Sequence, residues 1–181
     1  MTNEYDAEFS TSRLSRLSRK SFVVGALARI NLNFSQLHPQ AATIAQELNL
    51  PPICHNPFMN IVAQLVECIH VVLDSISIID TLLDSYWQQP KEEFQVKAGI
   101  GTAAVEVPRG TLYHSYEIDE HGVATKADCV VPTGQNHPNI YYDIVELATE
   151  CAKQEIEDDK IELLAAMLIR AYDPCISCSV H

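Results

Sequence analysis

Apolar residues recur with the period of a helix over one long segment of this chain. Between residues 58 and 86 they alternate at intervals of four and three, which places them on one helical face. These positions are Phe58, Val62, Leu65, Ile69, Val72, Ile76, Ile79, Leu83 and Tyr86. Asn56 offers an N-cap and Pro57 suits the first helical position, while Pro90 ends the pattern after Trp87. The broad apolar stripe predicts a long helix packed inside a helical bundle.

Three shorter segments also have helical patterns. One is predicted from Pro39 to about Asn49, with Ile44 and Leu48 on its buried side. A second should begin at Pro138 and run through Cys151. The last should be capped by Asp159, and its apolar residues are Leu163, Leu164, Met167 and Leu168.

Residues 99–132 have a different pattern, rich in β-branched and aromatic side chains. Two runs, Thr111–Ile118 and Val123–Val131, surround the turn-forming residues 119–122. Such a pattern is typical of an antiparallel β-hairpin.

These elements predict a mainly α protein, a bundle of long helices with a small antiparallel sheet inserted, in one domain over residues 1–181. Residues 1–22, rich in serine and arginine, are expected to be a solvated loop or a partner-binding segment. Residues 23–98 should be helical, 99–132 the β insert, and 133–181 helical up to a terminal metal motif.

Composition narrows the class of protein. With 47% apolar and 20% charged residues, a chain of 181 residues can bury a globular core. The formal net charge is -12, and residues 31–181 are strongly acidic, which argues against a nucleic-acid surface. No run of about 18 apolar residues lacks charges, and no signal peptide is visible, so the expectation is a cytoplasmic protein without a membrane span.

The six cysteines are not expected to form a disulfide framework, because a chain of this size needs none. Most are expected to be free thiols. Cys68 and Cys151 lie in apolar helical patterns and are expected to be buried as small hydrophobic residues. Only Cys175 and Cys178 are close in sequence.

This pair belongs to the C-terminal sequence Asp173-Pro174-Cys175-Ile176-Ser177-Cys178-Ser179-Val180-His181. Two cysteines three apart, just after a helix that Pro174 must stop, can project their sulfurs toward one point. Thiolates prefer soft metals, which include nickel, zinc, copper(I) and the iron of iron–sulfur clusters. A simple metal carrier or a thiol redox protein can have such a pair too. In thiol redox proteins, however, the pair opens a helix that follows a strand, whereas here it follows a helix.

The terminal Asp-Pro-Cys-x-x-Cys-x-x-His resembles the C-terminal signature of nickel–iron hydrogenase large subunits. Residues 107–114 look like that family's Pro-Arg-Gly segment, and residues 132–138 look like its next loop. Residues 4–6 and 24–33 are similar to stretches of the cytoplasmic, NAD-reducing type. The resemblance spans the whole chain and corresponds to the C-terminal half of that large chain.

The resemblance implies a role for each matched residue. Cys175 would be a terminal nickel ligand, and Cys178 a thiolate bridging nickel to an iron that also holds carbon monoxide and cyanide. Arg109 would lie above the two metals and act on dihydrogen or the departing proton through its charge. Thr133 would hydrogen-bond a cyanide, and Asp173 would hydrogen-bond near Arg109.

The same resemblance gives lesser roles to four further residues. His181 would bind a structural ion of the magnesium type. Pro108, His114 and Glu106 would belong to the shell of residues that supports Arg109.

The chain also departs from the family. It has no Arg-x-Cys-Gly-x-Cys segment, which supplies the other two of the family's four nickel-binding cysteines, and it lacks the glutamate of the first proton relay. Ala26 stands where a proline is expected. We therefore expect this chain alone to be inactive, and a second chain to supply the missing cysteine pair.

The resemblance implies a metal-carrying component that cleaves dihydrogen heterolytically and passes electrons to an iron–sulfur small subunit, with maturation factors that install the metals. An alternative is a catalytically inactive, truncated or remnant large subunit that serves as an interaction or assembly module. In that case the apolar helix at residues 58–86 would bury itself against partners.

Overall fold

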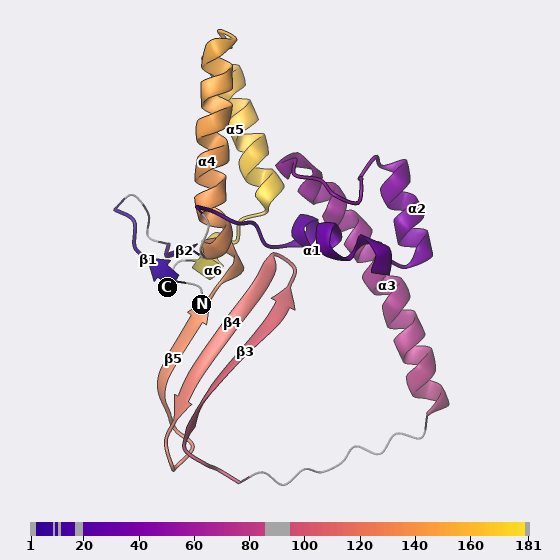
Figure 1. Ribbon diagram of the computed structural model, residues 1–181, viewed down its shortest axis with the longest axis vertical. Coiled ribbons are helices and arrows are strands. Elements are labelled where there is room, and N and C mark those ends of the chain that lie inside the picture. The colour runs from indigo at the N-terminus through magenta and orange to yellow at the C-terminus, as the bar shows by residue number, and fades with distance from the viewer. Residues whose placement is uncertain (1–2, 9, 11, 17–19, 86–94, 180–181) are drawn as a thin grey trace.

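The computed structural model describes residues 3–8, 10, 12–16, 20–85 and 95–179. Its helices form two groups, and a three-stranded sheet extends away from the place where the groups meet (Figure 1). The mainly helical fold with a small antiparallel sheet is the one that the sequence predicts.

The first helical group lies on residues 26–84. It consists of α1 (Ala26–Asn33), η1 (Phe34–Gln36), α2 (Pro39–Glu47), η2 (Pro57–Met59) and α3 (Asn60–Asp84), where η1 and η2 are 3-10 turns. Its buried core is made of small and branched side chains: Ala26, Leu27, Ile30, Ala41, Ala45, Leu50, Ala63 and Val66. Burial of this apolar surface is the main force that holds α1 and α2 against the start of α3.

The position of α2 agrees with the prediction, but its buried side does not. Ala41 and Ala45 are fully buried, whereas Leu48 follows the last helical residue and is 38% exposed. Ile44 is only partly buried. The small alanines let α2 approach α3 closely, a contact that residue volume decides and hydrophobic period alone does not.

The beginning of α3 is capped as the sequence predicts. The side-chain oxygen of Asn56 accepts a hydrogen bond from the backbone N–H of Phe58 at 3.1 Å, and Pro57 is the first residue of the turn that leads into the helix. The predicted end of this helix, between Trp87 and Pro90, lies outside the described residues.

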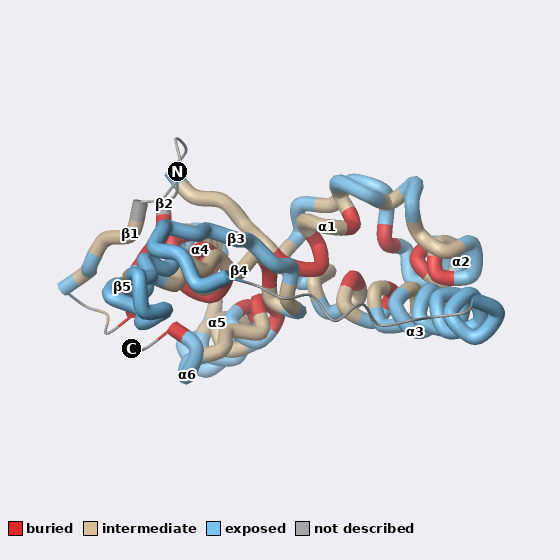
Figure 2. Tube along the Cα trace, turned by 90° about the horizontal axis from the view of Figure 1, so that it is seen from below, coloured by how far each residue is buried: buried red, intermediate tan, exposed pale blue. Residues whose placement is uncertain are grey.

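The prediction that α3 packs inside a bundle is wrong for this chain. Only Ala63 and Val66 of α3 are buried, and Figure 2 shows the helix exposed along most of its length. Cys68 is exposed as well, against expectation, whereas Cys151 is buried. The exposed apolar residues of this helix are Ile61, Leu65, Val71, Val72, Ile76, Ile78, Ile79, Leu82 and Leu83.

This segment also bears on the expected lack of a membrane span. Among the described residues, the helical stretch Pro57–Asp84 is long and apolar enough to cross a membrane by length and composition. Length and composition alone also select core helices of soluble proteins, so this property by itself identifies no membrane.

The inserted sheet has three antiparallel strands in the order β3 (Gly99–Val107), β4 (Gly110–Ile118) and β5 (Ala124–Val130). The predicted hairpin corresponds to β4 and β5. At its turn, the Asp119 carboxylate accepts hydrogen bonds from the backbone N–H groups of His121 and Val123, both at 2.9 Å. β3 lies within the predicted β insert, residues 99–132, but its own bounds were not predicted, because glycines and alanines interrupt its β-branched residues.

The second helical group consists of α4 (Pro132–Lys153), α5 (Asp158–Tyr172) and the short α6 (Ile176–Ser179). α4 and α5 run side by side in opposite directions (Figure 1). Ile140, Leu168 and Tyr172 form the buried contact between them.

Two helix starts in this group differ from the predictions. α4 begins at Pro132, so residues 132–138 are its first turns instead of a loop, and Pro138 lies inside the helix. In α5, Asp159 is a residue of the first turn and not the cap. A carboxylate there still favours the helix through the positive end of the helix dipole.

The N-terminal segment is more ordered than the predicted solvated loop. β1 (Asn3–Tyr5) pairs with β2 (Leu14–Arg16) in an antiparallel ribbon, and Leu14 is buried. A Cβ atom on Gly134 of α4 would lie 2.8 Å from the carbonyl oxygen of Arg13, so the two backbones touch. The segment is therefore built into the fold next to α4.

Residues 24 and 25 pass between the sheet and α4. The Asn136 side chain accepts a hydrogen bond from the Val24 backbone N–H at 2.8 Å and donates one to the Val24 carbonyl at 3.2 Å. On the other side, Gly110 has a φ of 137°, and a Cβ there would lie 2.3 Å from Cγ2 of Val24. Only glycine fits this position.

We therefore expect Gly110→Ala to destabilise the chain by about 2–4 kcal/mol, because it combines a disfavoured backbone conformation with a steric overlap. Urea unfolding of the purified chain measures the change as a lower midpoint. Gly101→Ala is the matched control, because it lies in the same sheet and its added methyl group would have nothing within 4 Å. Equal midpoints for the two variants would contradict the close packing of Gly110 against Val24.

Candidate metal centre

The tight turn between β3 and β4 places Arg109 next to the helices. Val107 pairs with Gly110 across the turn, and Pro108 and Arg109 are its two central residues. A Cβ atom on Gly25 would lie 3.0 Å from the carbonyl oxygen of Arg109. The backbone of the turn is thus held against the start of α1.

The Arg109 side chain reaches the end of α5 and binds Asp173 in two ways. Its Nε donates to the Asp173 backbone carbonyl at 2.8 Å, and its Nη2 donates to the carboxylate Oδ1 at 3.2 Å. The Gln64 amide of α3 donates to the other carboxylate oxygen at 3.1 Å. Both charged side chains are 38% exposed, so this ion pair fixes orientation more than it adds stability.

Asp173 ends α5 in the left-handed conformation, with a φ of 51°, and Pro174 follows it. The chain thereby turns toward α4, where the Thr133 hydroxyl accepts a hydrogen bond from the backbone N–H of Cys175 at 3.2 Å. Thr133 is 2% exposed. The structure therefore brings Arg109, Thr133, Asp173 and Cys175 together from three separate segments.

Cys175 and Cys178 lie across the first turn of α6 with their Cα atoms 5.3 Å apart, and their sulfurs are joined as a disulfide. Metal binding requires the reduced pair: two electrons and two protons give two thiols, and loss of the protons gives two thiolates. Cys178 is exposed and Cys175 partly exposed, so ligands from elsewhere can reach both.

These two sulfurs fit half of a four-coordinate soft-metal site. Among the described residues, no group of three or more histidine, cysteine and acidic side chains is placed to hold a metal ion. His181, assigned to a magnesium-type ion, lies outside the described residues. A complete centre would therefore need donors beyond those that the structure describes.

His114 and Glu106 lie in the sheet and have contacts of their own. His114 Nδ1 is 3.0 Å from the Tyr116 hydroxyl and 3.2 Å from Sγ of Cys129. Glu106 accepts hydrogen bonds from Arg29, at 2.8 Å, and from Thr111. Neither contact set includes Arg109.

The environment of Glu106 favours its charged form. Partial burial raises the pKa of its carboxyl, but the hydrogen bonds from Thr111 and Arg29 outweigh that effect and bring the pKa below its ordinary value. Arg29 also donates to the Pro108 carbonyl at 2.9 Å. Sequence reasoning assigned no role to Arg29, although a charge within the apolar pattern of α1 was a signal that could have identified it.

A cavity of about 430 Å³ lies beside Arg109. Its walls come from the start of α1, from Asn136 and Asn139 of α4, and from Tyr172 at the end of α5. Tyr172 donates a hydrogen bond to the Asp143 carboxylate at 2.6 Å. Burial, followed by the adjacent Asp143, raises the pKa of the Tyr172 phenol well above its ordinary value.

Comparison with known proteins identifies the family of this chain. A family model described as nickel-dependent hydrogenase matches residues 2–181. The chain belongs to this family. The alpha chain of sulfhydrogenase 1 from Pyrococcus furiosus is 32% identical over 178 residues, and the match covers 98% of this chain and 41% of that protein.

Two other hydrogenases match about half of the chain. A component of the F420-non-reducing hydrogenase of Methanothermobacter marburgensis is 48% identical over 91 residues, which is 50% of this chain and 19% of that protein. The beta chain of the NAD-reducing hydrogenase HoxS from Cupriavidus necator is 40% identical over 85 residues, 46% of this chain and 17% of that protein. The chain thus spans about two fifths or less of the length of these relatives.

Solved structures of hydrogenases have the same fold. An NAD⁺-reducing nickel–iron hydrogenase in its H2-reduced state superposes with a TM-score of 0.77 at 21% identity, covering 99% of this chain and 41% of that one. The Ni-Fe-Se hydrogenase of D. vulgaris Hildenborough gives a TM-score of 0.66 at 19% identity, covering 96% and 38%. At such low identity, these likenesses establish the fold alone.

The contact between Thr133 and Cys175 can be tested in the purified chain. Thr133→Val keeps the shape of the side chain but removes the acceptor, so we expect the Cys175 amide to exchange its hydrogen about tenfold faster. Thr133→Ser keeps the hydroxyl and should preserve the slow exchange. Equal exchange in both variants would show that the hydroxyl does not hold Cys175.

The raised pKa of Tyr172 makes the free energy of unfolding depend on pH. Its pKa is raised on folding, so its contribution is complete below the unfolded value of about 10 and is lost as pH rises above it. We expect the urea midpoint to fall above about pH 10, and to fall less steeply in Tyr172→Phe. Tyr116→Phe, at an exposed tyrosine of β4, is the control and should retain the wild-type slope. A wild-type slope in Tyr172→Phe would contradict this assignment.

Proposed function

We propose that this chain is the metal-carrying component of a nickel–iron hydrogenase, in which Cys175 and Cys178 supply two thiolate ligands. The observation that carries the proposal is the way Cys175 is held. Thr133 binds its backbone N–H at 3.2 Å, and two residues earlier Asp173 binds Arg109 at 2.8 Å. Two hydrogen bonds thus hold the C-terminal segment on either side of Pro174, one at Asp173 from Arg109 and one at Cys175 from Thr133, which supports the assignment of the cysteine pair to a metal centre.

In the reduced chain, the thiolates of Cys175 and Cys178 would hold the nickel and the iron. The bound metals, with carbon monoxide and cyanide on iron, supply the chemistry by which dihydrogen becomes two protons and two electrons. Thr133 is buried beside the pair, where its hydroxyl can orient the cysteine backbone and a ligand on iron.

Arg109 contributes a positive charge held in one orientation. Its rigid, planar guanidinium lets Arg109 act through its charge and the fixed direction of its N–H groups. Asp173 and Gln64 limit the movement of this charge. The cavity of about 430 Å³ beside Arg109 leaves room for a molecule as small as dihydrogen.

The partners follow from what these residues lack. A second polypeptide would supply the other cysteine pair, an iron–sulfur small subunit would accept the electrons, and maturation factors would install the metals. His181 would hold a magnesium-type ion. The assembly would operate in the cytoplasm.

A second candidate function is supported by the exposed apolar face of α3. A groove of about 600 Å³ between α2 and α3 is lined by apolar residues that include Ile44, Ile69 and Val72. Soluble monomers rarely leave so large an apolar surface uncovered. A catalytically inactive large-subunit remnant that binds partners through this face would account for it without any metal.

Metal content separates the two functions. For protein isolated from its native host with its partners, we expect near-stoichiometric nickel and iron by elemental analysis, and a cysteine-bearing second chain. Cys178→Ser should lose nickel because a hydroxyl is a poor ligand for it. Cys68→Ser, at an exposed cysteine of α3, should keep the wild-type content.

Metal-free wild-type protein that still binds its partners would contradict the hydrogenase proposal and favour the interaction module. Equal nickel in Cys178→Ser and wild type would show that the metal is bound somewhere else.

A further inference from the structure

Arg29, on α1, uses every N–H group of its guanidinium in a described hydrogen bond. Nε and Nη2 donate to the two carboxylate oxygens of Glu67, each at 2.7 Å. Nη1 donates to Glu106 at 2.8 Å and to the Val107 carbonyl at 3.0 Å, and Nη2 also donates to the Pro108 carbonyl at 2.9 Å. A guanidinium has five such groups in a rigid plane, so its orientation is fully determined.

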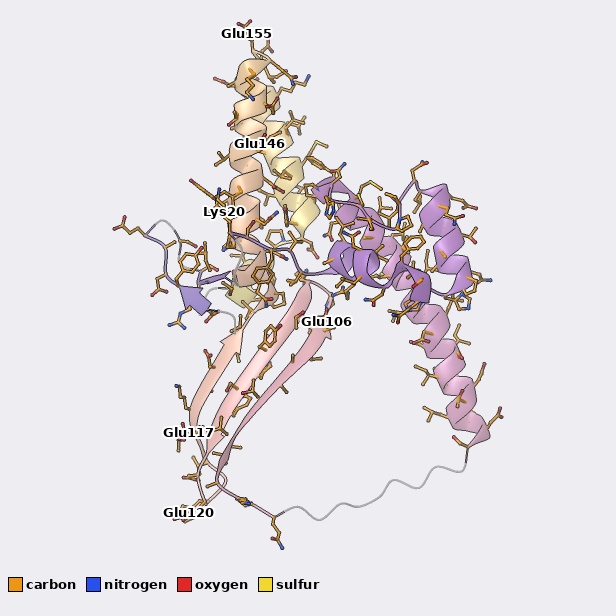
Figure 3. All side chains as sticks on the ribbon, in the orientation of Figure 1. Lys20, Glu106, Glu117, Glu120, Glu146 and Glu155 are labelled. Carbon is orange, nitrogen blue, oxygen red and sulfur yellow. A yellow bond between two sulfur atoms is a disulfide. The ribbon has the colours of Figure 1, made fainter. Side chains whose placement is uncertain are left out.

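These bonds join three elements to the turn that carries Arg109. Glu67 belongs to α3, and Glu106 lies at the tip of the sheet nearest α1, whereas Glu117 and Glu120 lie at the far end (Figure 3). Val107 and Pro108 immediately precede Arg109. The bonds to their carbonyls therefore act on the backbone of the turn itself.

We infer that Arg29 is a positioning residue for Arg109: by binding the carbonyls of Val107 and Pro108, it sets where the Arg109 guanidinium lies relative to the cysteine pair. This inference rests on the proposed function for its effect on turnover. The placement of Arg109 by Arg29 is a structural claim that does not depend on the proposed function.

Burial and charge make Arg29 a firm support. Its side chain is 22% exposed and Glu67 is 20% exposed, so their bidentate ion pair is shielded more than an ordinary surface pair. The hydrogen bond with Glu67, and then that with Glu106, raise the pKa of Arg29 despite its burial. The charge that holds the turn is therefore present throughout the physiological pH range.

Lysine cannot replace this arrangement. Its ammonium is a single point with three donors, so it can keep the charge beside Glu67 but cannot also hold two backbone carbonyls in a plane. Arg29→Lys thus retains the net charge and removes the geometry. That difference makes it the variant of choice.

The first experiment uses the complete, metal-loaded enzyme with its partners. Hydrogen oxidation is measured with benzyl viologen as a one-electron acceptor, two molecules being reduced for each dihydrogen. We expect Arg29→Lys to lower kcat about tenfold or more with unchanged nickel content, because small displacements of an orienting group reduce turnover strongly. Arg170→Lys, at an exposed arginine near the end of α5, should retain wild-type kcat.

A double-mutant cycle distinguishes positioning from general structural support. If Arg29 acts through Arg109, Arg29→Lys should change kcat by no more than about twofold in an Arg109→Lys background. The same tenfold loss in both backgrounds would overturn the inference, as would an unchanged kcat in Arg29→Lys alone.

A second readout needs no activity. In the purified chain, the Arg109 Nε–H is bonded to the Asp173 carbonyl, and its exchange with solvent can be followed by nitrogen-15 NMR. Faster exchange in Arg29→Lys, with no change in Arg170→Lys, supports the positioning role. Unchanged exchange would overturn it.

The two readouts keep the failures of the two proposals apart. A metal-loaded wild-type complex without hydrogen turnover would overturn the proposed function and the kinetic effect inferred for Arg29. Faster Arg109 exchange in Arg29→Lys would still support its structural role.

Discussion

Val24 and Gly25 pack their backbone against the turn at Arg109 and Gly110, and the arrangement of the candidate centre depends on this contact. Gly110 leaves no room for a side chain beside Val24, and Gly25 leaves little beside the Arg109 carbonyl. Asn136 then binds both backbone groups of Val24 from α4. One extended segment thereby fixes the tip of the sheet relative to both helical groups.

The charged contacts around this segment determine geometry more than stability. The pair of Arg109 and Asp173 is over a third exposed, where ion pairs contribute about 0–1 kcal/mol. The pair matters because it orients Arg109: hydrogen bonds to both the carbonyl and the carboxylate of Asp173 hold the guanidinium in one orientation. Glu67 fixes the orientation of Arg29 in the same way, and Arg29 in turn binds the backbone of the turn that carries Arg109. An electrostatic role at a metal centre requires this fixed orientation.

The cysteine pair and the apolar face of α3 have one feature in common: within the described residues, each lacks the groups that would complete it. Two sulfurs supply half the donors of a four-coordinate metal site, and α3 buries only Ala63 and Val66. The relatives are more than twice as long as the part that this chain matches. Both observations motivate the proposal that this chain works as one component of a larger assembly.

The sequence by itself determined the local features. The period of α3, the Asn56 cap and the β4–β5 hairpin depend on neighbours within a few residues, and the structure has all three. The terminal cysteine motif and Arg109 were likewise recognised from short patterns. Tertiary structure decided the rest: the buried alanines of α2, the start of α4 and the network of Arg29. These depend on long-range packing and on hydrogen bonds such as that from Arg29 to Pro108, 79 positions away, which no local period encodes.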